Sequence, residues 1–446
     1  MASDQWTSRI GFILAAAGSA IGLGTVWRLP YVAGTEGGGA FFLIFLILLL
    51  TLGSTLLLAE FVLGRRTQEG AIRAYKNVAS NGNWHWIGIL GMVTAFLLLS
   101  FYSVVGGWII AYLVRSFSGQ VTSPPGGDYS ALFETITANP WEVGIAHLAF
   151  MVMTILVVQR GIRKGIEKAT VYMMPALFIL FAVLVVRSLT LDGAWEGVVF
   201  FLQPDLSAVS GQTLLTALGQ AFFSLSLGVS VMVTYSSYLG KSENLPRSAW
   251  SVVYLTILIA FMAGLVIFPS VFAFDLEPDE GPMLIFTILP AVFGEITFGS
   301  IFFTLFMILM LFATLTSAFS LVEIVVAPLI RGKEEQKRVK MTWTVGLLIF
   351  VLGIPSNLSF GLLSDWHIFG DIFFNQLDFL VSNILLPIGA LLISLFVPWK
   401  MSKTDLQEEL LRGSNRGNSF FSMWLFTIRY IVPIAIVVVF ISMLAG

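Results

Sequence analysis

Long apolar stretches separated by short polar connections dominate the chain. Each is long enough to cross the hydrocarbon core of a bilayer, which takes about 20 helical residues. The eleven stretches lie at residues 10–33, 40–63, 88–115, 142–158, 169–188, 213–239, 250–274, 299–330, 342–355, 372–397 and 420–444. This pattern predicts an all-α polytopic membrane protein with eleven transmembrane helices.

Basic residues gather in alternate connections between these stretches. The intervening loops, such as 119–141 and 275–298, contain acidic residues but no Lys or Arg. Because Lys and Arg concentrate on the cytoplasmic side of membrane proteins, the N-terminus is expected in the cytoplasm, and an odd helix count then places the C-terminus outside. The basic connections contain Arg65, Arg66, Arg73, Lys76; Arg160, Arg163, Lys164, Lys168; Lys241, Arg247; Arg331, Lys333, Lys337, Arg338, Lys340; and Lys400, Lys403, Arg412, Arg416.

Composition excludes several other classes of protein. The chain of 446 residues is 57% hydrophobic and only 11% charged, whereas soluble domains carry about 25% charged residues. A net charge of −2 gives no basic face for a nucleic acid. The chain has no Cys, and its three His residues show no metal-ligand spacing. We expect no cleavable signal, because residues 1–9 lack an apolar core.

Two of the apolar stretches are interrupted near their centres. Residues 17–25 contain three glycines and two hydroxyl residues, about 12 residues or roughly 18 Å of helix from the start of the span. Residues 223–230 interrupt the sixth stretch at a similar depth. A single Gly18-x-x-x-Gly22 motif is often a helix-packing contact, but two matched breaks favour a secondary-transporter site at midplane, where unwound backbone must line protein or water. We expect inverted repeats at about 9–190 and 211–398, and an extra helix at about 420–444.

Five motifs, in family order, give the chain its resemblance to a known family. They are residues 22–30 (GLGTVWRLP), 37–41 (GGGAF), 219–226 (GQAFFSLS), 313–317 (ATLTS), and Gly165 followed by Pro175. Together they resemble the neurotransmitter:sodium symporter family, the solute carrier 6 type, and specifically its bacterial eleven-helix amino-acid transporters. The resemblance implies one transmembrane domain over 1–446, a LeuT-like fold with helices 1 and 6 unwound at midplane, and alternating access.

The resemblance also implies a substrate site at the two breaks. Free N–H groups at a half-helix N-terminus attract an anion, so a substrate carboxylate is expected there. Amine-transporting relatives carry Asp where this chain has Gly22, which indicates an amino-acid substrate. The alternative for each pocket residue is ordinary helix packing. The implied substrate residues are Ala20, Gly22, Leu23, Gly24, Leu98, Tyr102, Phe223, Ser224, Ser226, Val229 and Leu321.

Ion coupling is where the sequence departs from the family pattern. The second sodium site maps onto Gly18, Ile21, Ala313, Thr316 and Ser317, which supply suitable oxygen ligands. The first site maps onto Ala20, Thr25, Ser224 and Thr256. Relatives usually have amide or carboxylate side chains at two of these positions, Thr25 and Thr256, so we expect the first site to be weak or lost. The alternative is that a small helix shift lets both threonines reach the ion.

Chloride is not expected to take part in transport. Phe45 stands where chloride-dependent relatives have a tyrosine, and Ala260 stands where some bacterial relatives have a glutamate.

The two gates implied by the family are represented unequally. Arg28 and Asp378 match the extracellular pair. The intracellular pair aligns with Ser3 and Arg331 and cannot form as in relatives, so we expect Trp6 to anchor the N-terminal segment instead. Glycine and proline weaken the helix between Gly165 and Pro175, and relatives unwind there to open a water path inward. Glu60 and Glu323 lie inside spans, and such residues need partners.

These observations predict an importer of a hydrophobic L-amino acid, branched aliphatic or aromatic, in the bacterial inner membrane. Coupling is expected through the second sodium site. A sodium-independent uniporter or exchanger on the same fold is the alternative, and a receptor that binds without translocating is a third class. We expect a monomer or weak oligomer surrounded by membrane lipid, and no enzyme, because no cluster of nucleophile, base and orienting group appears.

Overall fold

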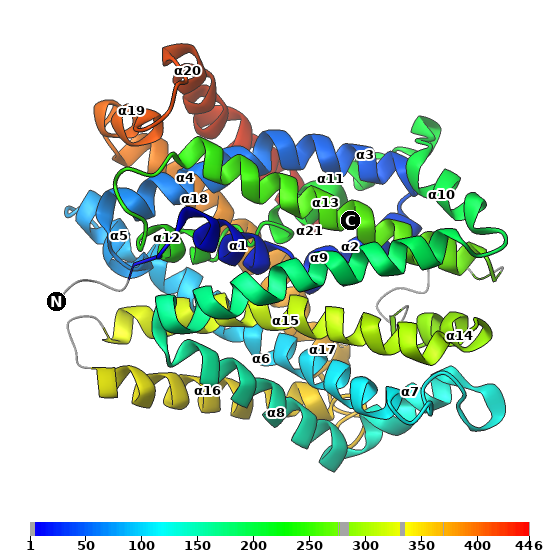
Figure 1. Cartoon of the computed structure of the whole chain (residues 1–446). Helices are drawn as coiled ribbons and strands as arrows, with labels where there is room; N and C mark the ends of the chain where they lie inside the picture. Colours follow the sequence, from blue (N-terminus) through cyan, green and yellow to red (C-terminus); the bar gives the residue numbers. More distant parts are fainter. Residues whose placement is uncertain (1–4, 275, 277–284, 331–334, 369, 446) are drawn as a thin grey trace.

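The structure is a computed structural model that describes residues 5–274, 276, 285–330, 335–368 and 370–445. Most of the described chain is helical, and the long helices lie side by side in one bundle (Figure 1). Ser3 and Arg331, on which the expectation for the intracellular pair rests, lie outside the described residues.

Nine helical segments of the described chain are long and apolar enough to cross a membrane. Some consist of an α-helix joined to a π-helical segment, labelled η. The spans contain α3 (Gly39–Leu48), η2 (Leu49–Gly53) and α4 (Ser54–Thr67); α6 (His85–Ser116); α8 (Pro140–Val158); η4 (Ile162–Glu167) and α9 (Lys168–Leu189); α13 (Leu245–Phe272); α15 (Gly299–Ile330); α16 (Glu335–Leu358); α17 (Phe373–Phe379), η7 (Leu380–Leu385) and α18 (Leu386–Lys400); α20 (Asn418–Phe426), η8 (Thr427–Ile431) and α21 (Val432–Ala445).

Two further spans are broken in the middle. In the first, α1 (Arg9–Ala20) is followed after a short gap by η1 (Gly24–Arg28) and α2 (Leu29–Thr35), with a bend of 51° between the two halves. In the second, α11 (Gly211–Phe223) and α12 (Val231–Ser236) are separated by irregular turns over residues 224–230. Within the described chain, the nine segments and the first broken span give ten helices that could cross a membrane, which is consistent with the eleven predicted spans. Both breaks fall where the sequence places them.

Shorter elements connect the spans at the two ends of the bundle. They are α5 (Ala71–Val78), η3 (Pro125–Gly127), α7 (Tyr129–Ala138), α10 (Ala194–Leu202), η5 (Leu206–Ala208), α14 (Ile288–Glu295), α19 (Lys403–Leu411) and an antiparallel pair of strands, β1 (His367–Ile368) and β2 (Asp371–Ile372), with His367 opposite Ile372.

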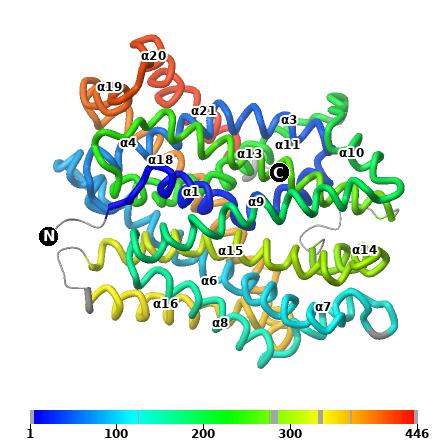
Figure 2. Tube along the Cα trace, in the orientation of Figure 1, coloured from blue at the N-terminus to red at the C-terminus, as the bar shows by residue number. Residues whose placement is uncertain are grey.

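The basic connections share one end of the bundle. Figure 1 shows the N-terminus, α5, α12 and α19 at this end, and α7, α10 and α14 at the opposite end. We call them the basic end and the far end. The tube in Figure 2 shows α1 running from the basic end toward the middle of the bundle, where the first break lies.

Burial separates a central scaffold from peripheral helices. Among the long spans α15 is the most buried, and it packs on α6, α8, α9 and α16. The span of η4 and α9 is the least buried, and Ile179 and Val186 on it are exposed. Apolar side chains of this size are stable on a helix surface that faces lipid, so α9 has one face toward the bundle and another toward the bilayer.

Candidate substrate and ion site

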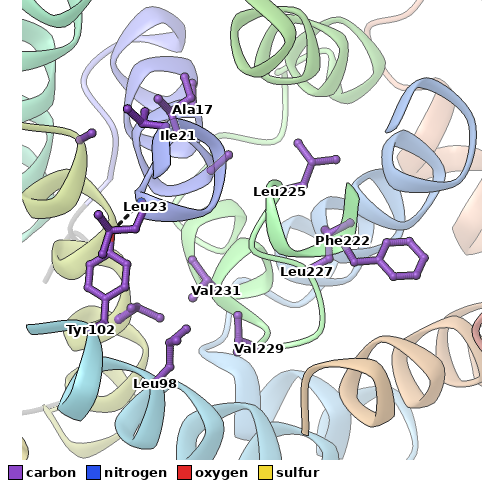
Figure 3. Packing of buried hydrophobic residues seen from close by; sticks show 14 of the residues in the cluster. Ala17, Ile21, Leu23, Leu98, Tyr102, Phe222, Leu225, Leu227, Val229 and Val231 are labelled. Carbon is purple, nitrogen blue, oxygen red and sulfur yellow. Dashed lines mark hydrogen bonds between the residues drawn. The ribbon is translucent and has the colours of Figure 1, made fainter. Parts of the chain in front are cut away.

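The break in the first span exposes backbone groups beside helix α6. Helix α1 ends at Ala20, and the N–H of Leu23 donates a hydrogen bond of 3.2 Å to the hydroxyl oxygen of Tyr102 on α6 (Figure 3). A Cβ atom on Gly22 would lie 2.2 Å from Ser317 Oγ and 2.5 Å from the Tyr102 hydroxyl. Glycine is therefore required at position 22 for packing, in addition to any requirement of the substrate.

The break in the second span has left-handed backbone at three positions. Ser226, Gly228 and Ser230 all have positive φ angles, of 52°, 89° and 58°. Ser226 Oγ donates to the carbonyl of Ser19 over 2.8 Å and so ties the two breaks together. The N–H of Gly228 donates to Glu60 Oε1 over 3.1 Å, which gives the buried carboxylate of Glu60 a partner in the unwound backbone.

A small pocket of about 30 Å³ lies between the two breaks. All predicted substrate residues line it except Ser224. Figure 3 shows Leu98 and Val229 near each other and away from Ile21. The lining residues are Ser19, Ala20, Gly22, Leu23, Gly24, Leu98, Tyr102, Phe223, Ser226, Val229, Ser317, Ser320, Leu321 and Leu386.

Three lining residues were not predicted from the sequence. The hydroxyls of Ser19 and Ser320 lie 2.7 Å apart and join α1 to α15. Both had a usable signal, because Ser19 lies inside the first break motif and Ser320 lies one helical turn after Ser317. Leu386 had none, since it is one leucine among many in an apolar span.

The oxygens predicted for the second sodium site come together between α1 and α15. Thr316 Oγ1 lies 3.0 Å from the carbonyl oxygens of both Gly18 and Ala313. Ser317 Oγ lies 3.1 Å from the Gly18 carbonyl. Ile21, the fifth predicted ligand, follows α1 directly in the break. Such a cluster of neutral oxygens, two hydroxyls among carbonyls, suits a hard cation.

The residues predicted for the first sodium site are all buried, but only Ala20 and Thr25 bond to each other. Thr25 Oγ1 donates to the Ala20 carbonyl over 3.1 Å, whereas Thr256 Oγ1 donates to Val252 of its own helix over 3.0 Å. Ser224 Oγ accepts a hydrogen bond of 3.1 Å from Gln220. Among the described residues, no hydrogen bond joins Ser224 or Thr256 to the Ala20 and Thr25 pair.

Gln220 is a polar residue at this site that the sequence analysis did not assign. Its amide nitrogen donates to the Gly24 carbonyl over 2.6 Å and to Ser224, and so bridges the two broken spans. Its Oε1 atom is buried and has no hydrogen-bond partner within the described chain. A long amide in an apolar helix was the available signal, because buried polar side chains need partners.

A larger cavity of about 260 Å³ lies between the pocket and the far end of the bundle. Arg28 and Asp378 both line it, as do Leu23, Tyr102 and Phe223, which also line the pocket. The guanidinium of Arg28 lies 4.9 Å from the ring centroid of Phe223, and Asp378 Oδ1 accepts from Ser382 over 2.7 Å. No salt bridge within 4.0 Å joins Arg28 to Asp378 in the described chain, so the predicted pair shares a cavity without closing it.

The basic end is closed by the N-terminal segment. Trp6 Nε1 donates to the Tyr235 carbonyl over 2.9 Å, and the Trp6 N–H donates to the Tyr238 carbonyl. The Tyr238 hydroxyl in turn donates to Glu323 Oε1 over 2.8 Å. Glu323 forms a salt bridge with Arg338 at the start of α16. Glu323 therefore has the partners that its buried position requires.

The segment between Gly165 and Pro175 begins in the π-helical η4 and continues as the regular α-helix α9 from Lys168. Gly165 lies in the π-helical η4, and a Cβ atom there would lie 2.1 Å from the Val157 carbonyl. Pro175 lies inside α9 and removes one backbone donor. The described chain departs from α-helix only in the Gly165 part of the predicted weak stretch, and its unwinding stays a prediction.

A family model and several known proteins match the chain over nearly its whole length. The model described as the sodium:neurotransmitter symporter family matches residues 3–124 and 130–446. An uncharacterized sodium-dependent transporter of Bacillus subtilis, YhdH, is 55% identical over 99% of this chain and 97% of its own. An uncharacterized sodium-dependent transporter of Haemophilus influenzae is 36% identical over 98% of each chain.

The fold matches a solved transporter structure. The crystal structure of MhsT in complex with L-phenylalanine has a TM-score of 0.91 to this chain, at 41% identity and 99% coverage of both chains. This match confirms the predicted LeuT-like fold, and the relatives are transporters, not enzymes. The protein is a multi-pass membrane protein that belongs to the sodium:neurotransmitter symporter family.

Proposed function

We propose that the protein imports a hydrophobic L-amino acid, branched aliphatic or aromatic, together with sodium. The observation that carries this proposal is the pocket between the two breaks. It combines polar backbone and hydroxyl groups at one side with apolar side chains at the other. The phenylalanine bound to MhsT, the structural neighbour, supports the same class of substrate.

The polar side of the pocket would hold the amino-acid backbone of the substrate. The Leu23 N–H donates to the Tyr102 hydroxyl oxygen, and a carboxylate that entered between them would accept from the N–H and from the hydroxyl. The start of η1 at Gly24 adds the positive end of a half-helix. The substrate ammonium would meet carbonyl groups of the breaks, including that of Ala20, and the Ser226 hydroxyl. Ser224 would act from just outside the pocket, where it accepts a hydrogen bond from Gln220.

The apolar side of the pocket sets the substrate class. Leu98, Phe223, Val229 and Leu321 offer no partner to a charged side chain, and burying an unpaired charge costs several kcal/mol. Because the pocket is only about 30 Å³, it must widen to accept a branched aliphatic or aromatic side chain. The 260 Å³ cavity next to it provides the route of entry.

Sodium coupling is proposed through the second site. Its oxygens converge from α1 and α15, two helices that alternating access would move apart, so a cation there favours their contact. The first site is proposed to be weak, because Thr256 bonds to its own helix instead of to the other predicted ligands. A role for chloride is not proposed, since Phe45 and Ala260 offer no side-chain donor.

We propose further that the basic end faces the cytoplasm of a bacterial inner membrane, with the C-terminus outside, in a monomer or weak oligomer. The positive-inside rule supports this orientation. The halves over 9–190 and 211–398 would then move against each other around the fixed site.

Binding of the twenty amino acids to the purified protein, each with sodium and with choline in its place, tests the proposal. Leucine, isoleucine, valine and the aromatics should bind, and choline should weaken binding and proteoliposome uptake about tenfold or more. Binding of Asp or Lys as strong as that of Leu would refute the apolar pocket. Unchanged uptake in choline would remove sodium and favour the uniporter or exchanger on the same fold.

A further inference from the structure

The carboxylate of Glu167 contacts the N-terminal end of α1 from a helix far away in the sequence. Glu167 Oε2 accepts from the Thr7 N–H over 2.7 Å, and Oε1 accepts from the Ser8 N–H over 3.1 Å and the Ser8 hydroxyl over 3.3 Å. Glu167 ends η4, immediately before α9. Two backbone donors and a hydroxyl from α1 therefore meet one carboxylate of the fifth span.

This contact is additional to the ordinary cap of α1. Ser8 is the N-cap residue, and its own Oγ accepts from the Gly11 N–H over 3.0 Å. Helix α1 thus has the local cap that a helix start needs. The bonds to Glu167 do not complete the helix; they attach its end to α9.

The fit between the two helices at this point is close. A Cβ atom on Gly11 would lie 2.0 Å from Glu167 Oε1, so the missing side chain of Gly11 makes room for the carboxylate. Glu167 is buried although Arg163, Lys164 and Lys168 around it are exposed. A negative charge at this position is also stabilised by the positive end of the α1 dipole.

Glu167 also borders a cavity whose walls contain basic side chains. A cavity of about 470 Å³ at the basic end is lined by Glu167, Thr7, Arg163, Lys164 and Lys168. If α1 moved away, Glu167 would find water and these basic side chains in this cavity instead of remaining an unpaired buried charge. The contact can therefore break without the large penalty that a stranded carboxylate would impose.

We propose that Glu167 is a positioning residue that holds the inner end of α1 closed against α9 and releases it when the transporter opens to the cytoplasm. The inference rests on the proposed alternating-access function. The carboxylate exchanges the α1 amide groups for water and the neighbouring basic side chains, at the point where η4 already departs from α-helix. The basic end is therefore held by the hydrogen bonds from the Thr7 and Ser8 N–H groups to Glu167, in addition to the Trp6 contacts.

Thiol accessibility can test this directly, because the chain contains no Cys and each reporter is then the only thiol. Met174→Cys reports the inner side, since Met174 is fully buried on α9 and faces Gly18 of α1. Val105→Cys reports the outer side, since Val105 lines the 260 Å³ cavity. Each is combined with Glu167→Gln, and with Glu167→Asp, which keeps the charge on a shorter side chain. Membrane-impermeant maleimide is applied from the corresponding side.

Glu167→Gln should raise the labelling rate of the inner reporter about tenfold, as expected for weakening hydrogen bonds to a charged group, and should lower that of the outer reporter. Glu167→Asp should give a smaller change in the same directions. Glu142→Gln is the matched control, because Glu142 pairs with Arg115 at the far end over 2.6 Å and should change neither rate.

Increased labelling of both reporters would show general loosening of the fold and would overturn the proposal, as would unchanged rates in a folded Glu167→Gln protein. The assay needs no substrate, so a wrong substrate assignment would show in the binding panel and would leave this result intact.

Discussion

The two ends of the transport path are closed by different kinds of contact. At the far end, which we propose faces outward and call the outer end, Arg28 and Asp378 line a cavity of about 260 Å³ and form no salt bridge within the described chain. The basic end is correspondingly the inner end. At the inner end, Trp6 and Glu167 fix the start of α1 through hydrogen bonds to backbone. Direct contacts therefore hold α1 in place at the basic end, whereas the 260 Å³ cavity keeps Arg28 and Asp378 apart on the side of the far end.

The difference teaches how each end can move. Two charges on opposite walls of a water-accessible cavity can approach or separate at small cost, because solvent screens them. The contacts of Trp6 and Glu167 are part-buried, directional hydrogen bonds, so they are lost when the start of α1 moves away. Glu323 and Arg338 add a salt bridge at this end, and Arg338 also donates to the Val158 carbonyl over 2.9 Å. These contacts hold the basic end together within the described chain, and Ser3 and Arg331 lie outside it.

The largest effect is expected from a substitution in the pocket between the two ends. Gly22→Ala would place a methyl group 2.2 Å from Ser317 Oγ, and binding of phenylalanine should fall about 100-fold or more, equivalent to roughly 3 kcal/mol. Calorimetry or scintillation proximity measures the affinity. Gly219→Ala is the matched control, because nothing lies within 4 Å of a Cβ atom at Gly219. Equal affinities in the two variants would contradict the assignment of the first break.

The next effect concerns the inner end. Arg338→Met removes the salt bridge of the fully buried Glu323 and leaves, among the described residues, its bond from the Tyr238 hydroxyl, so the free energy of unfolding should fall by roughly 3 kcal/mol. Arg66→Met removes the exposed pair with Asp405 and should cost less than about 1 kcal/mol. The free energy of unfolding of each variant is measured by chemical denaturation in detergent, and the melting temperature provides a second comparison. Similar losses would mean that the inner salt bridge is no stronger than a surface pair.

A smaller effect is expected at the outer end. Asp378→Asn removes a charge that forms no salt bridge in this closed-inward structure, so stability should change by less than about 1 kcal/mol. Uptake should nevertheless fall about tenfold, since closing the outer cavity would lose its charge pair. Proteoliposome uptake and the melting temperature are measured on the same preparation. Normal uptake would show that Arg28 and Asp378 do not meet during transport.

The smallest effect is expected from the anion in the medium. Replacing chloride by gluconate should change uptake by less than about twofold, because Phe45 provides no hydroxyl to donate to an anion. Restoring a hydroxyl with Phe45→Tyr provides the comparison. A strong loss of uptake in gluconate would require another chloride site.

The sequence by itself determines the membrane fold and the outline of the site. Apolar stretches and the placement of Lys and Arg are local properties, and they predict eleven spans and one basic end. The glycines of the first break and the serines of the second are local as well, because they weaken the helix wherever they occur. Tyr102 and Leu321 were assigned through the family resemblance, and both line the pocket.

Only the tertiary structure decides which residues meet across helices. Leu386 enters the pocket, and Glu167 reaches Thr7 although 160 positions separate them. Hydropathy and spacing constrain which face of one helix is apolar, but the partner of a buried carboxylate depends on how separate helices pack. For that reason the closed inner end, with Glu167 against α1 and Arg338 against Glu323, becomes visible only in the folded protein.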